Sequence, residues 1–290
     1  GELNKKLISN NSENAYEIFD YKNNDYNKIK ISKSDKFYPK NGKITFPQGS
    51  QGIITFGQQY KIIWRTKYSV GFQYCDREIL LEGNQSLTIS SNNKKEILYL
   101  LSLLNSKIVK LILEKNLRQE QEQAFFVAIT SIKQYVRVPK ITKENQFIKD
   151  EIIKRTEEML LLEEKTLSDF VGFSGIMLQK FDDVEIEGSN LILKHNGDKI
   201  KLKIKSNIKL VSETIQKELK EELKSENKKI NLADLKNLPV IDFEKQKKIK
   251  DYIDDLVFAL YFNVSINEIS RNKFDKIKNL CSKNKCYPIC

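Results

Sequence analysis

The spacing of apolar residues changes abruptly near residue 92. Between about residues 44 and 90 apolar side chains come in short runs rich in β-branched and aromatic residues, and glycines at positions 49, 52, 57, 71 and 83 separate these runs. From Glu96 to Glu114 apolar residues instead occupy nearly every face of a helix. The first pattern predicts a sheet, and the second predicts a helix enclosed by protein. We therefore expect a sheet with a buried core helix in the first half of the chain.

The next segment, Phe125 to Val138, is predicted to be extended and to lead through Pro139 into a long helix. That helix is predicted from Glu144 to Glu164, with Thr142 as its N-cap. Its apolar residues leave the opposite face charged, as in a helix that links two domains. We therefore place a domain boundary near residue 165.

The second half has a mixed pattern. A hairpin is predicted at Leu191–Ile204, where Asn196 and Gly197 suit the positive φ angles of a type I′ turn. Its second strand carries a row of lysines, which we expect the nearby acidic residues at positions 182–187 to neutralise. Helices are predicted over Val211–Glu226 and Phe243–Phe262.

These elements predict an α+β fold in three parts. Residues 1–145 form a β-rich domain with a buried core helix, and residues 146–165 form a spacer helix. Residues 166–290 form a mainly helical domain that contains the β-hairpin.

Charge is distributed unevenly along the chain. The formal net charge is +11, from 50 basic and 39 acidic residues. Residues 1–147 hold 23 basic and 14 acidic side chains, a surplus of nine, whereas the remainder holds 27 and 25, a surplus of two. A surplus concentrated in one part favours a polyanionic partner such as nucleic acid in that part. The alternative is codon usage in an AT-rich genome, which also enriches lysine.

Cysteine usage and hydropathy favour a cytoplasmic protein. Cys75 stands alone, and Cys281, Cys286 and Cys290 crowd the last ten residues, so the set makes a poor disulfide framework. The most apolar stretch, Ile97–Leu113, is interrupted by an asparagine and two lysines, which would be costly in lipid. We expect reduced thiols and no membrane span.

Motifs for catalysis are missing from the sequence. There is neither the glycine-rich loop nor the Asn-Pro-Pro-Tyr motif of an amino methyltransferase. Asp76 with Glu78, or Asp183 with Glu187, are the nearest candidates for a nuclease site, but neither pair is followed by Glu-x-Lys. The only histidine, His195, falls in the predicted turn. We therefore expect no catalytic residue, no metal site and no cofactor in this chain.

A basic aromatic region carries the strongest binding signal. Residues 58–68 and 73–77 alternate aromatic and polar side chains, and residues 130–137 form a second polar set. Arg, Lys and Gln hydrogen-bond base edges, and Lys and Arg also hold phosphates. Trp64 itself is expected in the core. The DNA-binding residues that we predict are Gln58, Gln59, Lys61, Arg65, Lys67, Gln73, Arg77, Lys133, Gln134 and Arg137.

Three segments in this order resemble the C-terminal specificity region of type IIG restriction-modification enzymes, which follows an adenine-specific methyltransferase domain. A β-rich stretch precedes Leu-Leu-Asn-Ser-Lys at residues 103–107, and residues 132–141 form a segment with Pro139 near its end, although the family often has a second proline where Lys140 stands. Residues 253–261 and 265–269 are similar to the family's closing helix and acidic turn. Type I specificity subunits share the first two features.

The resemblance implies that residues 1–145 are a DNA target-recognition domain and residues 166–290 a scaffold. A methyltransferase domain, expected upstream, would flip out an adenine and methylate it with S-adenosylmethionine. The partners implied are double-stranded DNA and that methyltransferase domain or subunit.

Three alternatives remain open. The first is a separate specificity subunit that partners a methyltransferase chain, and the second is an interaction scaffold that does not bind DNA. A nuclease with an unrecognised site is a further rival.

Overall fold

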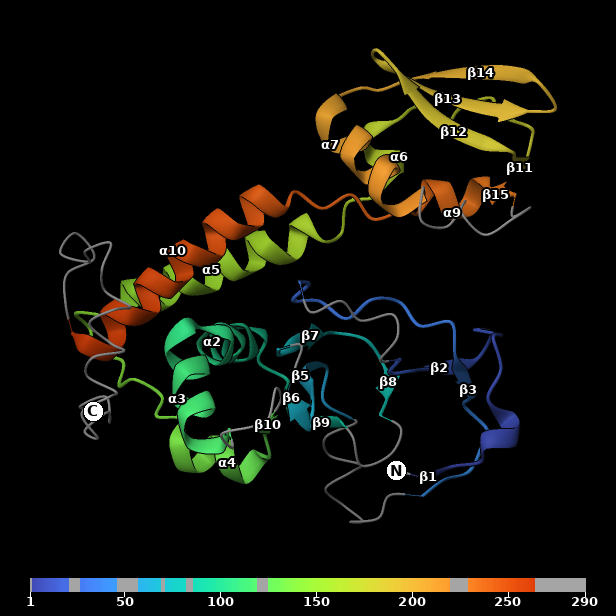
Figure 1. Cartoon of the computed structure of the whole chain (residues 1–290). Helices are drawn as coiled ribbons and strands as arrows, with labels where there is room; N and C mark the ends of the chain where they lie inside the picture. The colour runs from blue at the N-terminus through green and yellow to red at the C-terminus, as the bar shows by residue number, and fades with distance from the viewer. Residues whose placement is uncertain are drawn as a thin grey trace. The chain divides into compact units, whose positions relative to one another are not determined.

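The fold comprises two compact units. A computed structural model describes residues 2–20, 27–45, 57–68, 71–81, 86–118, 125–219 and 229–263. Unit 1 comprises residues 1–158 and 249–290, and unit 2 comprises residues 159–248. The chain leaves unit 1 within α5 (Gln146–Leu162) and returns to it within α10 (Phe243–Phe262) (Figure 1). Small sheets and helices occur together, which confirms the predicted α+β class.

A three-stranded antiparallel sheet lies in unit 1, with β5 (Tyr60–Arg65) between β7 (Gln73–Cys75) and β9 (Ser86–Ser91). Successive side chains of β5 face opposite sides of the sheet. Ile63 and Cys75 belong to the same buried apolar cluster. Helix α2 (Lys94–Asn105) contacts all three strands of the sheet. The predicted sheet and its buried helix are thus present among the described residues.

Trp64 is buried on β5, as predicted. Its ring lies tilted against that of Phe72, with 5.3 Å between the ring centroids. Its indole N–H donates a hydrogen bond to the carbonyl of Val127 at 2.8 Å. A buried indole requires such a partner, so Trp64 joins the sheet to the segment that follows β10 (Phe125–Phe126).

The predicted helix from Glu96 to Glu114 is in fact two helices, α2 and α3 (Lys107–Leu117). Ser106 separates them with extended backbone, at φ −68° and ψ 150°. Its hydroxyl accepts a hydrogen bond from the Val109 amide at 3.3 Å, so Ser106 caps α3. Apolar periodicity continues across the junction, which explains why the break escaped sequence reasoning.

Side chains from distant segments hold this α2–α3 junction. Asn105 hydrogen-bonds the amide of Phe72 at 3.0 Å and its carbonyl at 2.8 Å. Asp254, on α10, accepts a hydrogen bond from the Lys107 amide at 2.9 Å, and the Lys107 ammonium lies 2.7 Å from Asp251. Burial raises the pKa of the Asp254 carboxyl. The junction therefore joins α2 and α3 to the residue before β7 and to α10.

Smaller sheets occur in the N-terminal region of unit 1. A second three-stranded sheet and a two-stranded ladder are built from short strands of the N-terminal region. In the three-stranded sheet, the middle strand pairs antiparallel with one neighbour and parallel with the other. A 3₁₀ turn spans Lys5–Leu7. The elements are β2 (Ala15–Ile18) between β3 (Phe37–Pro39) and β8 (Ile79–Leu80), and β1 (Glu2–Leu3) paired with β4 (Ile44–Thr45).

The predicted extended segment Phe125–Val138 is a strand for only two residues. β10 pairs antiparallel with β6 (Lys67–Tyr68), and α4 (Ile129–Tyr135) follows. The prediction was wrong here because Ile132 and Val136 recur at helical spacing, and both are buried. Helix α4 contacts α3.

The two long helices match their predictions closely. Helix α10 has the predicted bounds, and α5 is two residues shorter at each end than predicted. Asn145, rather than Thr142, immediately precedes α5, and its carbonyl accepts a hydrogen bond from the Ile148 amide at 3.0 Å. The hydroxyls of Ser102 and Thr156 are hydrogen-bonded between α2 and α5. No helix in the described ranges is both long and apolar enough to cross a bilayer.

In unit 2 the predicted hairpin is confirmed. The strands β12 (Asp183–Glu187), β13 (Asn190–His195) and β14 (Asp198–Lys203) form an antiparallel meander. Asn196 and Gly197, between β13 and β14, have φ angles of 49° and 90°. Both values are positive, as a type I′ turn requires.

Short helices and a further ladder surround this meander, so unit 2 is mixed rather than mainly helical. The predicted helix over Val211–Glu226 begins at Ile208 and continues as a π-helix to Leu219, and the remainder of the prediction lies outside the described residues. One apolar cluster joins the meander to the helices. The elements are α6 (Leu167–Phe170), α7 (Ile208–Thr214), the π-helix η2 (Ile215–Leu219), α9 (Leu232–Lys236), and β11 (Lys180–Phe181) paired with β15 (Ile230–Asn231).

Candidate nucleic-acid interface

The ladder between β6 and β10 presents an aromatic ring beside a cation. Phe126 lies directly opposite Lys67 in this ladder, so both side chains are on the same face. The Phe126 side chain is 63% exposed, whereas its neighbour Phe125, on the opposite face, is 2% exposed. Lys67 is exposed as well.

Helix α4 adds three polar side chains close by in the sequence. Thr130, Lys133 and Gln134 are all exposed, and their spacing of three and four residues places them on one face of the helix. The helix begins three residues after Phe126. We call Lys67, Phe126, Thr130, Lys133 and Gln134 the β10–α4 surface.

The backbone beneath the β10–α4 surface is held on both sides. The Val127 amide donates a hydrogen bond to the Thr66 carbonyl at 2.8 Å, and the Val127 carbonyl accepts the one from Trp64. After α4, the Arg137 carbonyl accepts a hydrogen bond from the Tyr261 hydroxyl at 2.5 Å. The Arg137 side chain, predicted to bind DNA, is exposed beside this anchor.

Chemically, the β10–α4 surface combines three kinds of group. The ammonium groups of Lys67 and Lys133 are suited to phosphate oxygens. The Gln134 amide can donate to and accept from a base edge, and Thr130 can do either. The Phe126 ring offers a flat apolar face. Together these groups match a ligand that has both negative charge and aromatic rings.

Lys61 requires a correction, because it is not a surface lysine. Its side chain is 3% exposed, and its ammonium donates hydrogen bonds to the carbonyls of Gln58 at 2.6 Å, Gln59 at 3.4 Å and Arg77 at 3.4 Å. Burial lowers the pKa of this ammonium. Lys61 therefore stabilises the turn before β5 in this structure, and it is not available to a phosphate.

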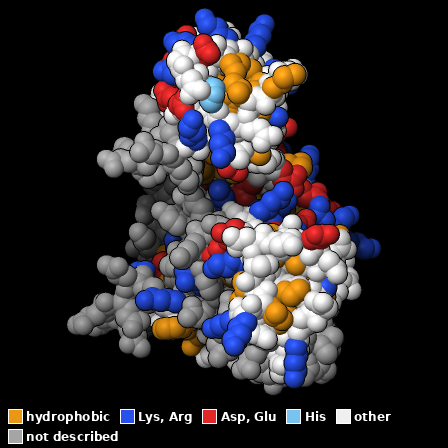
Figure 2. Space-filling view, turned by 90° about the vertical axis from the view of Figure 1, so that its right-hand side faces the viewer, with side chains coloured by type: hydrophobic (Ala, Val, Ile, Leu, Met, Phe, Trp, Pro, Cys, Tyr) orange, Lys and Arg blue, Asp and Glu red, His pale blue; other side chains and the backbone are white. Residues whose placement is uncertain are grey.

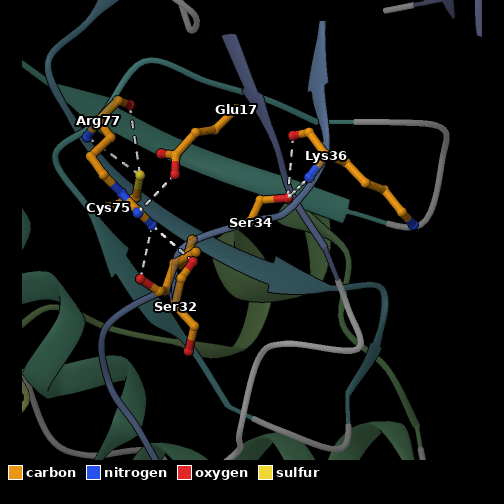
Figure 3. A network of polar contacts seen from close by, with 7 residues as sticks. Glu17, Ser32, Ser34, Lys36, Cys75 and Arg77 are labelled. Atoms are coloured by element: carbon orange, nitrogen blue, oxygen red, sulfur yellow. Dashed lines mark hydrogen bonds and ion pairs between the residues drawn. The ribbon is translucent and has the colours of Figure 1, made fainter. Parts of the chain in front are cut away.

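Gln73 and Arg77 are corrected for the same reason. Gln73 is buried within β7. Arg77 lies 3.2 Å from the carboxylate of Glu17 and donates hydrogen bonds to the carbonyls of Ile31 at 2.9 Å and Ser32 at 3.0 Å (Figure 3). This guanidinium joins β2, the segment before β3 and the β7–β8 connection, so its role is structural.

The other residues predicted near β5 do not form one patch. Gln58 is half-buried, and the backbone N–H of the exposed Gln59 donates a hydrogen bond to the side-chain oxygen of Asn92 at 3.0 Å. Arg65 is half-buried at the other end of β5, opposite Ser86. Because β5 has six residues and is about 17 Å long, the predicted residues at its two ends lie far apart. Of the predicted residues, the structure brings Lys133 and Gln134 together on α4 and places Lys67 beside Phe126.

The excess positive charge belongs almost entirely to unit 1. Unit 1 contains 33 basic and 23 acidic residues, a surplus of ten, whereas unit 2 contains 17 and 16, a surplus of one. Because residues 249–290 belong to unit 1, the charge surplus differs more between the two units than between residues 1–147 and the rest of the chain. The unit that carries the β10–α4 surface is therefore the one with most of the net positive charge.

The prediction that acidic residues neutralise the lysine row of the hairpin is confirmed for Lys199. Lys199 lies 2.9 Å from Glu187, and Lys194 lies 2.6 Å from Glu185 and 3.1 Å from Asp183. Figure 2 shows acidic and basic side chains next to each other on the visible face of this unit. In the lysine row of β14, Lys199 is neutralised in this way, whereas Lys201 and Lys203 are exposed.

Groups that could serve catalysis are engaged in structural contacts. The Glu78 carboxylate lies 3.0 Å from the Lys40 ammonium, and Asp183 pairs with Lys194. Cys75 is a buried free thiol, and burial raises its pKa, which keeps it protonated. Cys281, Cys286 and Cys290 lie outside the described residues.

Phe126 is the residue of the surface that sequence reasoning missed. The signal was present, because two consecutive phenylalanines in a strand must point to opposite faces. With Phe125 in the core, Phe126 faces outward. The predicted extended conformation of this segment already implied that Phe126 faces outward.

Known proteins provide no guide to the role of this surface. Comparisons with protein-family models, with curated protein sequences and with solved structures find no significant match to this chain. The functional proposal therefore depends on the residues and geometry described above, together with the sequence resemblance.

Proposed function

We propose that unit 1 binds double-stranded DNA through the β10–α4 surface and is the sequence-reading part of a restriction-modification adenine methyltransferase. One observation carries this proposal. Exposed Lys67 lies opposite the exposed ring of Phe126, and exposed Lys133 and Gln134 follow on α4, in the unit that has a surplus of ten positive charges. Phosphate contacts by the lysines supply affinity, and base-edge contacts by Gln134 supply selectivity.

The sequence resemblance to type IIG specificity regions supports the same role. It implies that a methyltransferase domain or subunit, which uses S-adenosylmethionine, is the second partner. Under this proposal the chain itself is not catalytic, and it acts in the cytoplasm. A separate specificity subunit would use the β10–α4 surface in the same way.

Salt-dependent binding tests the proposal. The affinity for random-sequence duplex DNA is measured across a salt series for the wild type and for the double variant Lys67→Ala/Lys133→Ala. We expect a steep decrease of log K with log salt in the wild type. The slope becomes shallower by about two in the double variant, because each lysine that contacts a phosphate releases about one counterion.

The matched control is Lys201→Ala/Lys203→Ala, which removes the same charge from exposed lysines of unit 2. We expect this control to keep the wild-type slope. An equal loss in both double variants would mean that only net charge matters, and no binding at low salt would favour an interaction scaffold. Selection from a random DNA pool then tests sequence reading, for which the wild type is expected to enrich a common site.

A further inference from the structure

The exposure of Phe126 is the starting point. Burying a phenylalanine side chain stabilises a protein by roughly 1.5–3 kcal/mol relative to leaving it in water, yet Phe126 remains 63% exposed. Among the described residues of unit 1, Phe147 is comparably exposed, at 61%, but it lies on α5 rather than on a strand.

Phe126 is also rigidly supported. Phe125 and Val127, on either side of it, are buried. Its strand pairs with β6, and the Val127 amide and carbonyl are both hydrogen-bonded, to Thr66 and to Trp64. The backbone that carries the ring is therefore fixed before a ligand binds, so no ordering of the chain opposes a contact with Phe126.

The surroundings of the ring indicate the chemistry of its partner. Lys67 lies across the ladder on the same face, and Lys133 and Gln134 follow on α4. A lone apolar partner would not match these cations, and a peptide of acidic residues alone would leave the ring without a stacking partner. Nucleic acid supplies phosphates for the lysines and planar bases for the ring.

In an intact duplex the faces of the bases are stacked on one another, so only their edges are open to a protein. A ring can reach a base face only where a base is unpaired or unstacked. Opening a paired step costs a few kcal/mol, and that cost is smallest at a mismatched or damaged position.

We propose that Phe126 stacks on a base, or fills the gap left by one, at a locally opened position of the bound duplex. This inference rests on the proposed DNA-binding function of the β10–α4 surface. It assigns to this chain a preference for opened DNA that the lysines alone would not produce.

The test compares affinities for a paired duplex and for the same duplex with one abasic site. We expect the wild type to bind the abasic duplex about tenfold more tightly, because stacking on one base accounts for roughly that factor. Phe126→Leu keeps the apolar contact but removes the ring, so the preference falls to about twofold or less. Phe126→Trp restores it.

The matched control is Phe147→Leu, which removes an equally exposed ring outside the surface and is expected to keep the tenfold preference. Trp64 emission checks the folding of each variant except Phe126→Trp, for which far-ultraviolet circular dichroism is used. A wild type without preference, or a Phe126→Leu variant that keeps it, would overturn the inference. Thymine is also replaced by uracil in the DNA. If Phe126→Leu then no longer weakens binding, the ring contacts the thymine methyl group instead of stacking, and the inference is overturned.

Failure of this inference is distinguishable from failure of the proposed function. Binding of the paired duplex, with a slope that depends on Lys67 and Lys133, can persist when the preference for the abasic duplex is absent. In that case DNA binding stands and stacking by Phe126 does not. If the wild type binds neither duplex at low salt, both proposals fail.

Discussion

Lys61 illustrates how one residue can carry a charge at a cost to stability. Its ammonium is enclosed by three backbone carbonyls, which replace part of its hydration. Burial still lowers its pKa below the usual value of a lysine. The protonated form is therefore less favourable in the folded chain than in the unfolded chain, where the pKa is about 10.4.

The sign of the pH effect follows from proton binding. Between the folded pKa of Lys61 and about 10.4, the unfolded chain binds more protons, so the free energy of unfolding rises with pH. We expect the wild type to gain stability relative to Lys61→Met across this range, by about 1.4 kcal/mol for each pH unit between the two pKa values. Urea unfolding, followed by Trp64 emission from pH 7 to 10.5, measures this difference.

The control for Lys61→Met is Lys95→Met, which removes the charge of an exposed lysine in the same unit. A difference between the wild type and Lys61→Met that stays constant with pH would contradict the prediction. It would mean that the carbonyl cage solvates the ammonium as well as water does.

At the scale of elements, the β13–β14 hairpin depends on its two-residue turn. Asn196 and Gly197 have positive φ angles, which match the twist of the flanking strands. Leu191 and Leu193, on β13, are buried in the cluster that joins the sheet to the helices of unit 2. A distorted turn would therefore disturb the register that keeps these side chains in the core.

Gly197→Ala is expected to destabilise the hairpin by about 1–2 kcal/mol, because a Cβ atom is disfavoured in left-handed backbone. The φ angle of 90° at Gly197 is the reason, since no atom crowds the position where the Cβ would be. Hydrogen exchange of the β13 and β14 amides measures the effect. Gly172→Ala is the control within unit 2, because the added Cβ would make only an ordinary contact with Lys205, at 3.6 Å. Equal exchange in both variants would argue against strain in the turn.

At the scale of the whole molecule, unit 2 is inserted between the two helices that belong partly to unit 1. The chain enters and leaves unit 2 at adjacent points, because the Val240 amide donates a hydrogen bond to the Lys165 carbonyl at 3.0 Å. Nearby, the Gln246 side chain donates to Glu163 at 2.6 Å. Backbones paired in this way are about 5 Å apart.

This connectivity predicts that unit 2 can be removed. Joining Glu164 to Ile241 with a flexible linker of about four residues spans the gap. We expect the shortened chain to keep Trp64 buried and to keep the wild-type salt slope on duplex DNA, since the charge surplus lies in unit 1. Tryptophan emission and the salt series measure both properties. A markedly shallower slope would assign part of the DNA interface to unit 2.

Several features followed directly from local sequence. Asn196-Gly197 between alternating strands identified the hairpin, and apolar spacing gave the bounds of α10 and, within two residues, of α5. The imbalance of charge pointed to the first part of the chain. The hairpin and the helix bounds were predicted correctly because turn geometry and helical period depend on neighbouring residues.

Other features depend on contacts between distant segments, and only the fold decided them. Ser106 breaks the long apolar helix where Asp254 and Phe72 hold its two sides. Lys61 and Arg77 are polar in sequence but are enclosed by carbonyls and a carboxylate in space. The return of residues 249–290 to unit 1 likewise has no local signal, because a helical pattern shows that a face is buried and does not show which partner buries it.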